Sequence, residues 1–127
     1  MYEADSVEEI MLIHVFEHLY TWEAAEAVKR WYEILKPGGR LTIEVPCINK
    51  ILELFSKKER DPYLTFLGLY GEQDWGEKRV EMVHKWCYSY NQLMAVFRVG
   101  GFKKENISVK DPVYHRLIRD MRVEGVK

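Results

Sequence analysis

The feature that most constrains this chain is a short apolar segment, an amphipathic helical pattern and a second apolar segment in direct succession. Residues 9–14 form the first segment, whose length and polar borders are typical of a strand buried on both faces. Between residues 22 and 36 apolar side chains recur at helical spacing, with Thr21 as predicted N-cap and Trp31 and Leu35 expected to anchor the helix. Residues 40–46 are rich in β-branched residues and form a second predicted strand. Strand, helix and strand in this order predict a βαβ unit with parallel strands.

Glycine, proline and capping residues mark where the other elements begin and end. The run Lys-Pro-Gly-Gly at 36–39 ends the first helix, and we expect a positive φ at Gly39. Residues 47–84 are interpreted as an insertion with one or two helices and a loop. Ser89 is the predicted N-cap of a further helix, which Gly100 and Gly101 end, and residues 103–109 and 122–126 are the last predicted strands. The predicted fold class is α/β: one domain, residues 1–127, with a mixed sheet of about four strands flanked by helices on both faces.

Composition excludes several classes of protein. The 127 residues are 47% hydrophobic, enough for a packed core, and 19 Lys and Arg against 20 Asp and Glu leave a net charge of −1. That balance argues against a general nucleic-acid binder, which carries a basic excess. No apolar run approaches the roughly 20 residues that span a bilayer, and residues 1–5 are acidic, unlike a signal peptide. With only Cys47 and Cys87, the sequence favours a cytoplasmic protein without a disulfide framework.

Residues 14–18 read His-Val-Phe-Glu-His, which matches the H-x-x-E-H motif of the inverted zinc proteases. That chemistry needs His14 and His18 on one face of a helix, with Glu17 activating a zinc-bound water. His14 follows the first predicted strand directly, so a helix that aligns it with His18 has little room to begin. The sequence therefore assigns no metal ligand, and a zinc hydrolase is a remote alternative.

The position of this segment in the predicted sheet gives it a second interpretation. Ligands of open α/β sheets bind beyond the carboxyl ends of the strands, which parallel strands place at one edge. His14 and Val15 follow the first strand, and Pro46 and Cys47 end the second, so these residues are expected to contact any bound ligand. A histidine that only caps its strand is the alternative. Cys87, three residues after His84, is more typical of a core residue than of a nucleophile.

Several stretches resemble class I S-adenosylmethionine-dependent methyltransferases. Residues 5–10 (Asp-Ser-Val-Glu-Glu-Ile) and 14–19 (His-Val-Phe-Glu-His-Leu) are similar to the family's fourth strand and the segment after it. Residues 34–41 (Ile-Leu-Lys-Pro-Gly-Gly-Arg-Leu) resemble the link into the fifth strand, and residues 84–102 resemble the helix and Gly-Gly-Phe entry into the sixth. The resemblance implies a partial Rossmann-like methyltransferase fold, with the last strand antiparallel between the second and third, and S-adenosylmethionine as cofactor.

The resemblance covers nearly the whole chain but only the C-terminal half of the family's fold. The family binds its cofactor with a glycine-rich loop after the first strand, and no Gly-x-Gly occurs in this sequence. By match to the family motif, His14, Val15 and His18 would line the methionine end of the cofactor, while no catalytic residue is identified. The residues expected on the acceptor-substrate side are Pro46, Cys47 and His84. The aromatic residues Tyr63, Phe66, Tyr70 and Trp75 of the insertion either line a pocket or cover the core.

Two functions of different classes are compatible with these observations. The first is a methyltransferase-like domain, truncated or split, that needs a partner for cofactor binding. The second is a non-catalytic oligomeric α/β module derived from a methyltransferase. Without the family's first strand, the strand from Glu9 to His14 would form an unguarded sheet edge, which invites pairing with another chain. We therefore expect a homodimer or a partner chain at this edge, and neither a membrane nor a nucleic acid.

Overall fold

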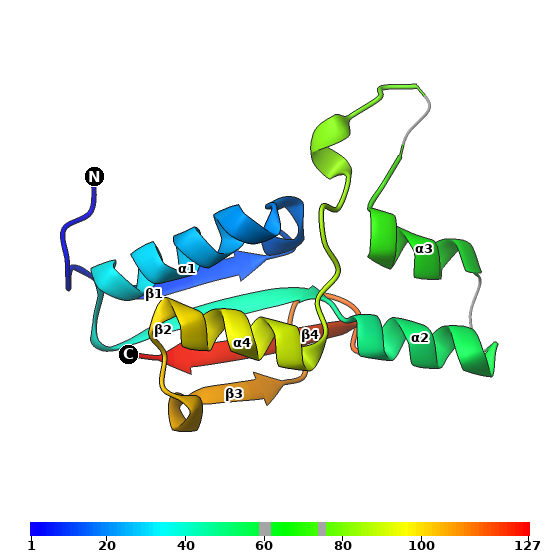
Figure 1. Ribbon diagram of the computed structural model, residues 1–127. Coiled ribbons are helices and arrows are strands. Elements are labelled where there is room, and N and C mark those ends of the chain that lie inside the picture. Colours follow the sequence, from blue (N-terminus) through cyan, green and yellow to red (C-terminus); the bar gives the residue numbers. More distant parts are fainter. Residues whose placement is uncertain (59–61, 74–75) are drawn as a thin grey trace.

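Four strands form one mixed sheet in the order β1-β2-β4-β3 (Figure 1). The structure is a computed structural model that describes residues 1–58, 62–73 and 76–127. β1 (Val7–Ile13) and β2 (Leu35–Pro46) are parallel, in a register that runs from Glu9 opposite Arg40 to Ile13 opposite Glu44. β4 (Asp120–Val126) lies antiparallel between β2 and β3 (Ile107–Lys110). The four predicted strands and their order are therefore confirmed, but β2 begins at Leu35 and so includes the run 36–39 that was expected to end the helix.

The third predicted strand is shorter than expected. A 3-10 turn, η3 (Lys104–Asn106), occupies the first half of the predicted strand, and β3 begins only at Ile107. The turn closes through a hydrogen bond from the Asn106 N–H to the Lys103 carbonyl at 2.9 Å. Lys104, Glu105 and Asn106 are residue types that strands disfavour, whereas β3 begins at the β-branched Ile107 and also contains Val109.

Helix α1 (Thr21–Ile34) connects the two parallel strands, and its ends differ in detail from the prediction. Tyr20 and not Thr21 is the N-cap residue, and its backbone N–H donates to the Glu23 carboxylate at 2.9 Å. At the other end the positive φ, +80°, belongs to Gly38 and not to Gly39. Gly39 is constrained for another reason, because a Cβ atom there would lie 2.8 Å from the Lys36 carbonyl oxygen.

The core lies between the sheet and two helices that pack side by side on one of its faces, α1 and α4 (Tyr90–Gly100) (Figure 1). Ser89 caps α4 as predicted, since its Oγ accepts from the Gln92 N–H at 3.1 Å. Gly100 lets the helices approach closely, because a Cβ atom there would lie 2.4 Å from a Val28 methyl group. Leu35 is completely buried, whereas Trp31 is only partly buried, so Leu35 is the stronger anchor of the two.

The opposite face of the sheet is polar, so the prediction of helices on both faces is wrong for this part of the sheet. Glu44 and Arg122 are opposite each other in the β2–β4 register and form a buried ion pair at 3.3 Å. The segment 111–119 covers this pair, and the backbone N–H groups of Val113, Tyr114 and His115 donate to Glu44 at 3.0–3.1 Å. A buried carboxylate with these partners replaces the apolar contacts that a second helical layer would need.

The insertion forms two helices, α2 (Ile48–Lys57) and α3 (Pro62–Tyr70), and a 3-10 turn, η2 (Val80–Met82). Figure 1 shows α2 and α3 beyond the ends of the strands and not against the sheet. Tyr63 lines a cavity described below, Phe66 and Tyr70 are exposed, and Trp75 lies outside the described residues. Over the ranges 1–58, 62–73 and 76–127, none of the helices has the length and apolar character that crossing a membrane requires.

Truncating the anchor between α1 and β2 tests this description of the core. We expect Leu35→Ala to lower the free energy of unfolding by about 2–5 kcal/mol, because it leaves a cavity at a completely buried position. The matched control is Val99→Ala, because Val99 on α4 is 74% exposed and its truncation should change stability by less than about 0.5 kcal/mol. Urea unfolding of both variants measures the difference, and equal midpoints would contradict the assigned core.

Candidate functional site

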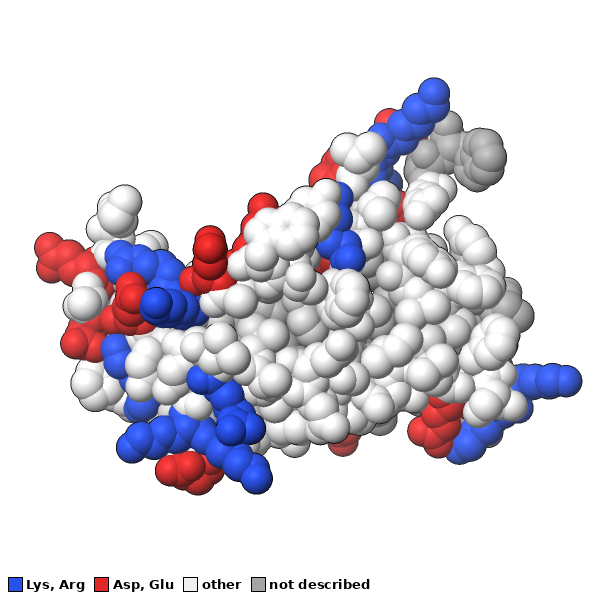
Figure 2. Space-filling view, in the orientation of Figure 1, with Lys and Arg blue, Asp and Glu red and all other residues white. Residues whose placement is uncertain are grey.

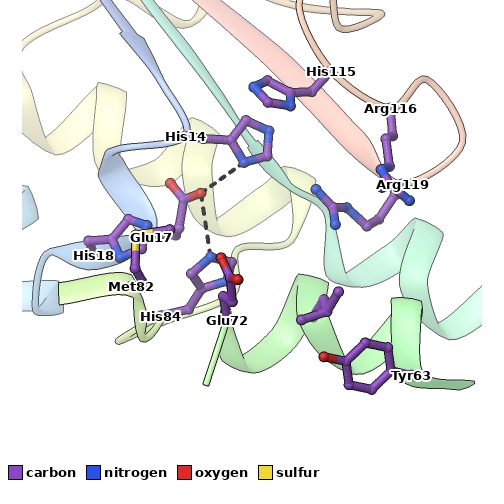
Figure 3. Close-up of a pocket in the computed structure, with 12 residues that line it drawn as sticks. His14, Glu17, His18, Tyr63, Glu72, Met82, His84, His115, Arg116 and Arg119 are labelled. Carbon is purple, nitrogen blue, oxygen red and sulfur yellow. Dashed lines mark ion pairs between the residues drawn. The ribbon is translucent and has the colours of Figure 1, made fainter. Parts of the chain in front are cut away.

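A cavity of about 370 Å³ opens beyond the carboxyl ends of β1 and β2, the edge at which the sequence predicts a ligand. Its walls come from η1 (Phe16–His18), α3, η2 and the segment before β4, so residues far apart in the sequence meet there (Figure 3). The residues that line it are His14, Glu17, His18, Tyr63, Leu67, Gly71, Glu72, Met82, His84, His115, Arg116 and Arg119. Charged and imidazole groups dominate this list, which favours a polar or charged ligand.

His14 directly follows β1 and turns the chain out of the sheet. Its backbone N–H donates to the Glu44 carbonyl at 2.9 Å, so the ladder with β2 continues through this residue. Its φ is +51°, a left-handed conformation that few residues other than glycine adopt, and this directs the chain into η1. The ring then lies between two carboxylates: Nδ1 is 3.1 Å from Oε1 of Glu17, and Nε2 is 3.1 Å from Oδ2 of Asp120.

These two carboxylates determine the charge of His14. Burial lowers the pKa of the ring, but the contacts with Asp120 and Glu17 outweigh it and raise the pKa to about 9. For Asp120 burial acts in the opposite direction and raises the pKa, but the contacts with His14 and Arg119 outweigh it and lower the pKa to about 2. His14 is therefore an imidazolium at neutral pH, and it joins the end of β1 to η1 and to the start of β4.

Glu17 is the most buried carboxylate in the wall of the cavity, with 1% of its side chain exposed. Neither carboxylate oxygen receives an aligned hydrogen bond, although His14 is close, and Oε1 lies 3.8 Å from Nε2 of His84 (Figure 3). Its carbonyl oxygen accepts from the Lys85 N–H at 2.7 Å, which fixes the segment that carries His84 against η1.

His18 and His84 are held edge to face, with ring centroids 4.8 Å apart. Nδ1 of His18 donates to the Val83 carbonyl at 3.1 Å, and Nδ1 of His84 donates to the Gly68 carbonyl at 3.0 Å. Burial lowers the pKa of His84, and the attraction of Glu17 opposes that effect only in part. Gly71, with a φ of +75°, permits the close approach of this segment, because a Cβ atom there would lie 2.1 Å from the Met82 carbonyl oxygen.

The structure brings together three of the six residues that the sequence singles out, since His14, His18 and His84 all line the cavity. Val15 also lies at the carboxyl end of β1, but its side chain is exposed outside the cavity. Pro46 and Cys47 are buried behind it, where the Cys47 N–H donates to the Arg119 carbonyl at 2.9 Å. Cys87 is half-buried and lies outside the hydrophobic core, and burial raises the pKa of its thiol to about 12, which does not suit a nucleophile.

The H-x-x-E-H segment does not form the helix that an inverted zinc protease uses. η1 is one 3-10 turn that contains His18 but not His14, and the two histidines of the motif make different contacts: His14 faces Asp120, whereas His18 faces the carbonyl of Val83. Glu17 lies beside His84, a pairing that the motif does not indicate. Arg116, Arg119 and Asp120 were missed as well, because about 100 residues separate them from His14 and only the fold brings them to this edge.

Comparisons with known proteins find similarity in structure only. No protein-family model and no curated protein matches the sequence. An S-adenosylmethionine-dependent methyltransferase from Methanosarcina mazei matches with a TM-score of 0.66 at 16% identity, over 99% of this chain and 61% of that protein. A second from Archaeoglobus fulgidus matches with a TM-score of 0.61 at 14% identity, over 99% of this chain and 62% of that protein. This chain has a class I methyltransferase-like fold.

A third similar structure contains bound molecules. It is the 1,6-didemethyltoxoflavin-N1-methyltransferase of Burkholderia thailandensis with 1,6-didemethyltoxoflavin and S-adenosylhomocysteine, and it matches with a TM-score of 0.58 at 12% identity. The match covers 100% of this chain and 46% of that protein. The chain thus spans less than two thirds of each of these three methyltransferases.

The raised pKa of His14 predicts how stability depends on pH. The two carboxylates stabilise the folded protein when the His14 ring is protonated. This stabilisation is complete below pH 6.5, the ordinary pKa of histidine, and is lost as the pH rises through about 9, where the ring in the folded protein loses its proton. The free energy of unfolding should therefore fall between pH 6.5 and 9.5 by an amount on the order of 3 kcal/mol. Urea unfolding with a chelator present measures this fall. His14→Gln is the control and should show a clearly smaller fall, whereas the same slope in both proteins would contradict the ion pair.

Proposed function

We propose that residues 1–127 form the acceptor-side half of an S-adenosylmethionine-dependent methyltransferase, whose nucleotide-binding half lies outside these residues. The observation that carries the proposal is the polar cavity beyond the carboxyl ends of β1 and β2, in a fold shared with such methyltransferases. In sheets of this kind that edge is where ligands bind. His14, Val15 and His18 are proposed to face the methionine end of the cofactor. On the acceptor side, His84 would contact the substrate from the wall of the cavity, and Pro46 and Cys47 would support that side from behind the wall.

Methyl transfer from a sulfonium requires that donor and acceptor be aligned, and positioning supplies most of the rate enhancement. The ion pairs of His14 hold one wall of the cavity in a fixed position, and Gly71 permits the close approach of the segment that carries His84. The imidazoles, Glu17, Arg116 and Arg119 make this a polar site, which suits a small polar acceptor. Methyl transfer in this proposal also needs the adenosine end of the cofactor to be bound by other residues.

The outer edge of β1 is the proposed contact with that other half. Across the ranges described, no strand pairs with this edge, and the side chain of Met11 on it is 41% exposed. An unpaired edge with an apolar residue favours addition of a strand from another polypeptide segment. We propose that a strand of the nucleotide-binding half, or β1 of a second copy, pairs here. If β1 of a second copy pairs here and no cofactor binds, the protein is the non-catalytic oligomeric module, which is the alternative function.

The cofactor assignment predicts which part of S-adenosylhomocysteine this chain contacts. In two-dimensional amide NMR spectra, titration with S-adenosylhomocysteine should shift the resonances of residues 14–18 and of the cavity wall, without saturation below about 1 mM. A dissociation constant of about 1 mM corresponds to a binding free energy of only about 4 kcal/mol, as expected when only half of the cofactor site is present. Adenosine is the control and should shift none of them.

Two outcomes would contradict this assignment in different ways. If no resonance near the cavity shifts, the methyltransferase proposal is wrong. Saturable binding at about 10 μM or below would show that these residues form a complete cofactor site, against the proposed division into halves.

If the outer edge of β1 is the contact with another polypeptide, a substitution on β1 should weaken association and a matched substitution on β3 should not. Met11→Lys places a charge at the proposed contact, so self-association, or binding to a chain with the other half, should weaken at least tenfold. Val109→Lys is the matched control, because Val109 lies on β3 at the opposite edge and is also 41% exposed. Sedimentation velocity measures both. A wild-type protein that remains monomeric at high micromolar concentration would contradict the second-copy arrangement, and equal effects of both lysines would contradict the β1 edge.

A further inference from the structure

Two imidazoles and a buried carboxylate converge on one side of the cavity. They differ from the set in the H-x-x-E-H motif, which would combine His14 with His18. Glu17 and His18 come from η1, and His84 comes from the segment after η2 (Figure 3). One potential ligand atom from each lies within 4.8 Å of the other two. We propose that Glu17, His18 and His84 bind a divalent transition-metal ion, with Zn²⁺ as the ion that suits them best. This inference does not depend on methyl transfer.

The hydrogen bonds of the two histidines leave the correct nitrogen of each ring free. A backbone carbonyl only accepts, so Nδ1 of His18, bonded to Val83, and Nδ1 of His84, bonded to Gly68, must both carry a proton. In the neutral rings Nε2 is then the atom with a lone pair. Histidines that bind metals in proteins have the same arrangement, in which the second ring nitrogen donates to a carbonyl or carboxylate that fixes the ring.

Glu17 supplies the negative charge that the ion requires. Its side chain is 1% exposed, and neither oxygen receives an aligned hydrogen bond within the described part of the chain. Buried carboxylates without such partners are unusual, because the loss of hydration is expensive unless a cation or donor replaces the water. Nδ1 of His14 lies 3.1 Å from Oε1 without an aligned hydrogen bond, so both carboxylate oxygens keep lone pairs that can bind a metal.

The distances and the number of ligands fit zinc. Ligand atoms 2.0–2.1 Å from Zn²⁺ in a tetrahedron are about 3.3 Å apart, and His84 Nε2 is already 3.8 Å from Glu17 Oε1. The remaining ligand atoms lie within 4.8 Å of one another, so binding would require the three side chains to move closer together. Two histidines and one glutamate leave a coordination position open toward the cavity, as in zinc sites that bind water or a substrate oxygen.

A second cluster in the same cavity is less suited to a metal. His14, His115 and Asp120 also offer atoms within 4.8 Å of one another. However, both ring nitrogens of His14 already contact carboxylates, and both oxygens of Asp120 receive hydrogen bonds from Arg119. The Arg116 N–H also donates to Asp120 at 3.0 Å. A metal there would have to displace these contacts, whereas Glu17, His18 and His84 need to lose none.

Isothermal titration of the metal-free chain with Zn²⁺ tests the proposal, with Co²⁺ as a spectroscopic probe. We expect one Zn²⁺ per chain, and visible Co²⁺ absorption of four- or five-coordinate strength. His18→Asn and His84→Asn should each weaken Zn²⁺ binding at least about 100-fold. Asparagine can still donate to the Val83 or Gly68 carbonyl but lacks an atom in the place of Nε2. Glu17→Gln, which removes only the charge, should do the same.

His115→Asn is the matched control, because it alters a histidine of the same cavity that belongs only to the second cluster. It should leave the affinity for Zn²⁺ within about threefold of the wild type. Circular dichroism and thermal unfolding establish that each variant is folded, and Zn²⁺ should raise the melting temperature of wild type and control alone. The absence of Zn²⁺ binding would overturn the proposal. So would loss of binding in His115→Asn with retention in His84→Asn, which would place the ion at the second cluster.

Discussion

The ion pair of His14 with Asp120 and Glu17 is the interaction on which the rest of the cavity depends. It joins three elements that the sequence places far apart: the end of β1, the turn η1 and the start of β4. Two carboxylates this close to each other would repel if no cation lay between them, and burial would strengthen that repulsion. The left-handed turn at His14 is stable because both ring nitrogens and the backbone N–H have partners.

A second polar network supports the first from the far face of the sheet. Glu44 lies beside His14 in the ladder and accepts three backbone N–H groups from segment 111–119, the segment that brings His115 and Arg116 to the cavity. Arg122 balances the charge of Glu44 within the sheet. The face that lacks helices is thus an ordered polar layer, and it positions one wall of the site. Figure 2 shows the contrasting helical side, whose centre carries few charged residues while most of them lie near its ends.

Patterns within single elements were sufficient to predict most of the fold. The spacing of apolar residues located β1 and α1, and Ser89 marked the start of α4. The order of strands β2, β4 and β3 came from the resemblance to methyltransferases, because no local pattern encodes which strands pair. Gly38 and Gly39 show the limit of local rules, since a turn that needs one left-handed residue does not reveal which of two glycines adopts it.

The site was predicted less completely, because its chemistry arises from tertiary contacts. His14 and His18 stand out in the sequence as a motif, but that motif implies a shared helical face that the single turn of η1 does not provide. A second histidine beside Glu17 is His84, which is 67 residues later and is positioned by Gly71 and by the Gly68 carbonyl. Asp120 carries no signal of its own in the sequence; its importance comes from lying opposite Pro46 in the β2–β4 register, at the edge where β1 also ends.

The most direct test of this account is the protonation of the histidine rings, measured by long-range ¹H–¹⁵N correlation spectra of the metal-free protein at pH 8. The account predicts that His14 carries protons on both nitrogens, since its pKa is about 9. We also expect Nδ1 of His18 and Nδ1 of His84 each to carry a proton, because each donates to a carbonyl. A neutral His14, or an Nδ1 of His18 or His84 that carries no proton, would contradict the organisation of the cavity described above.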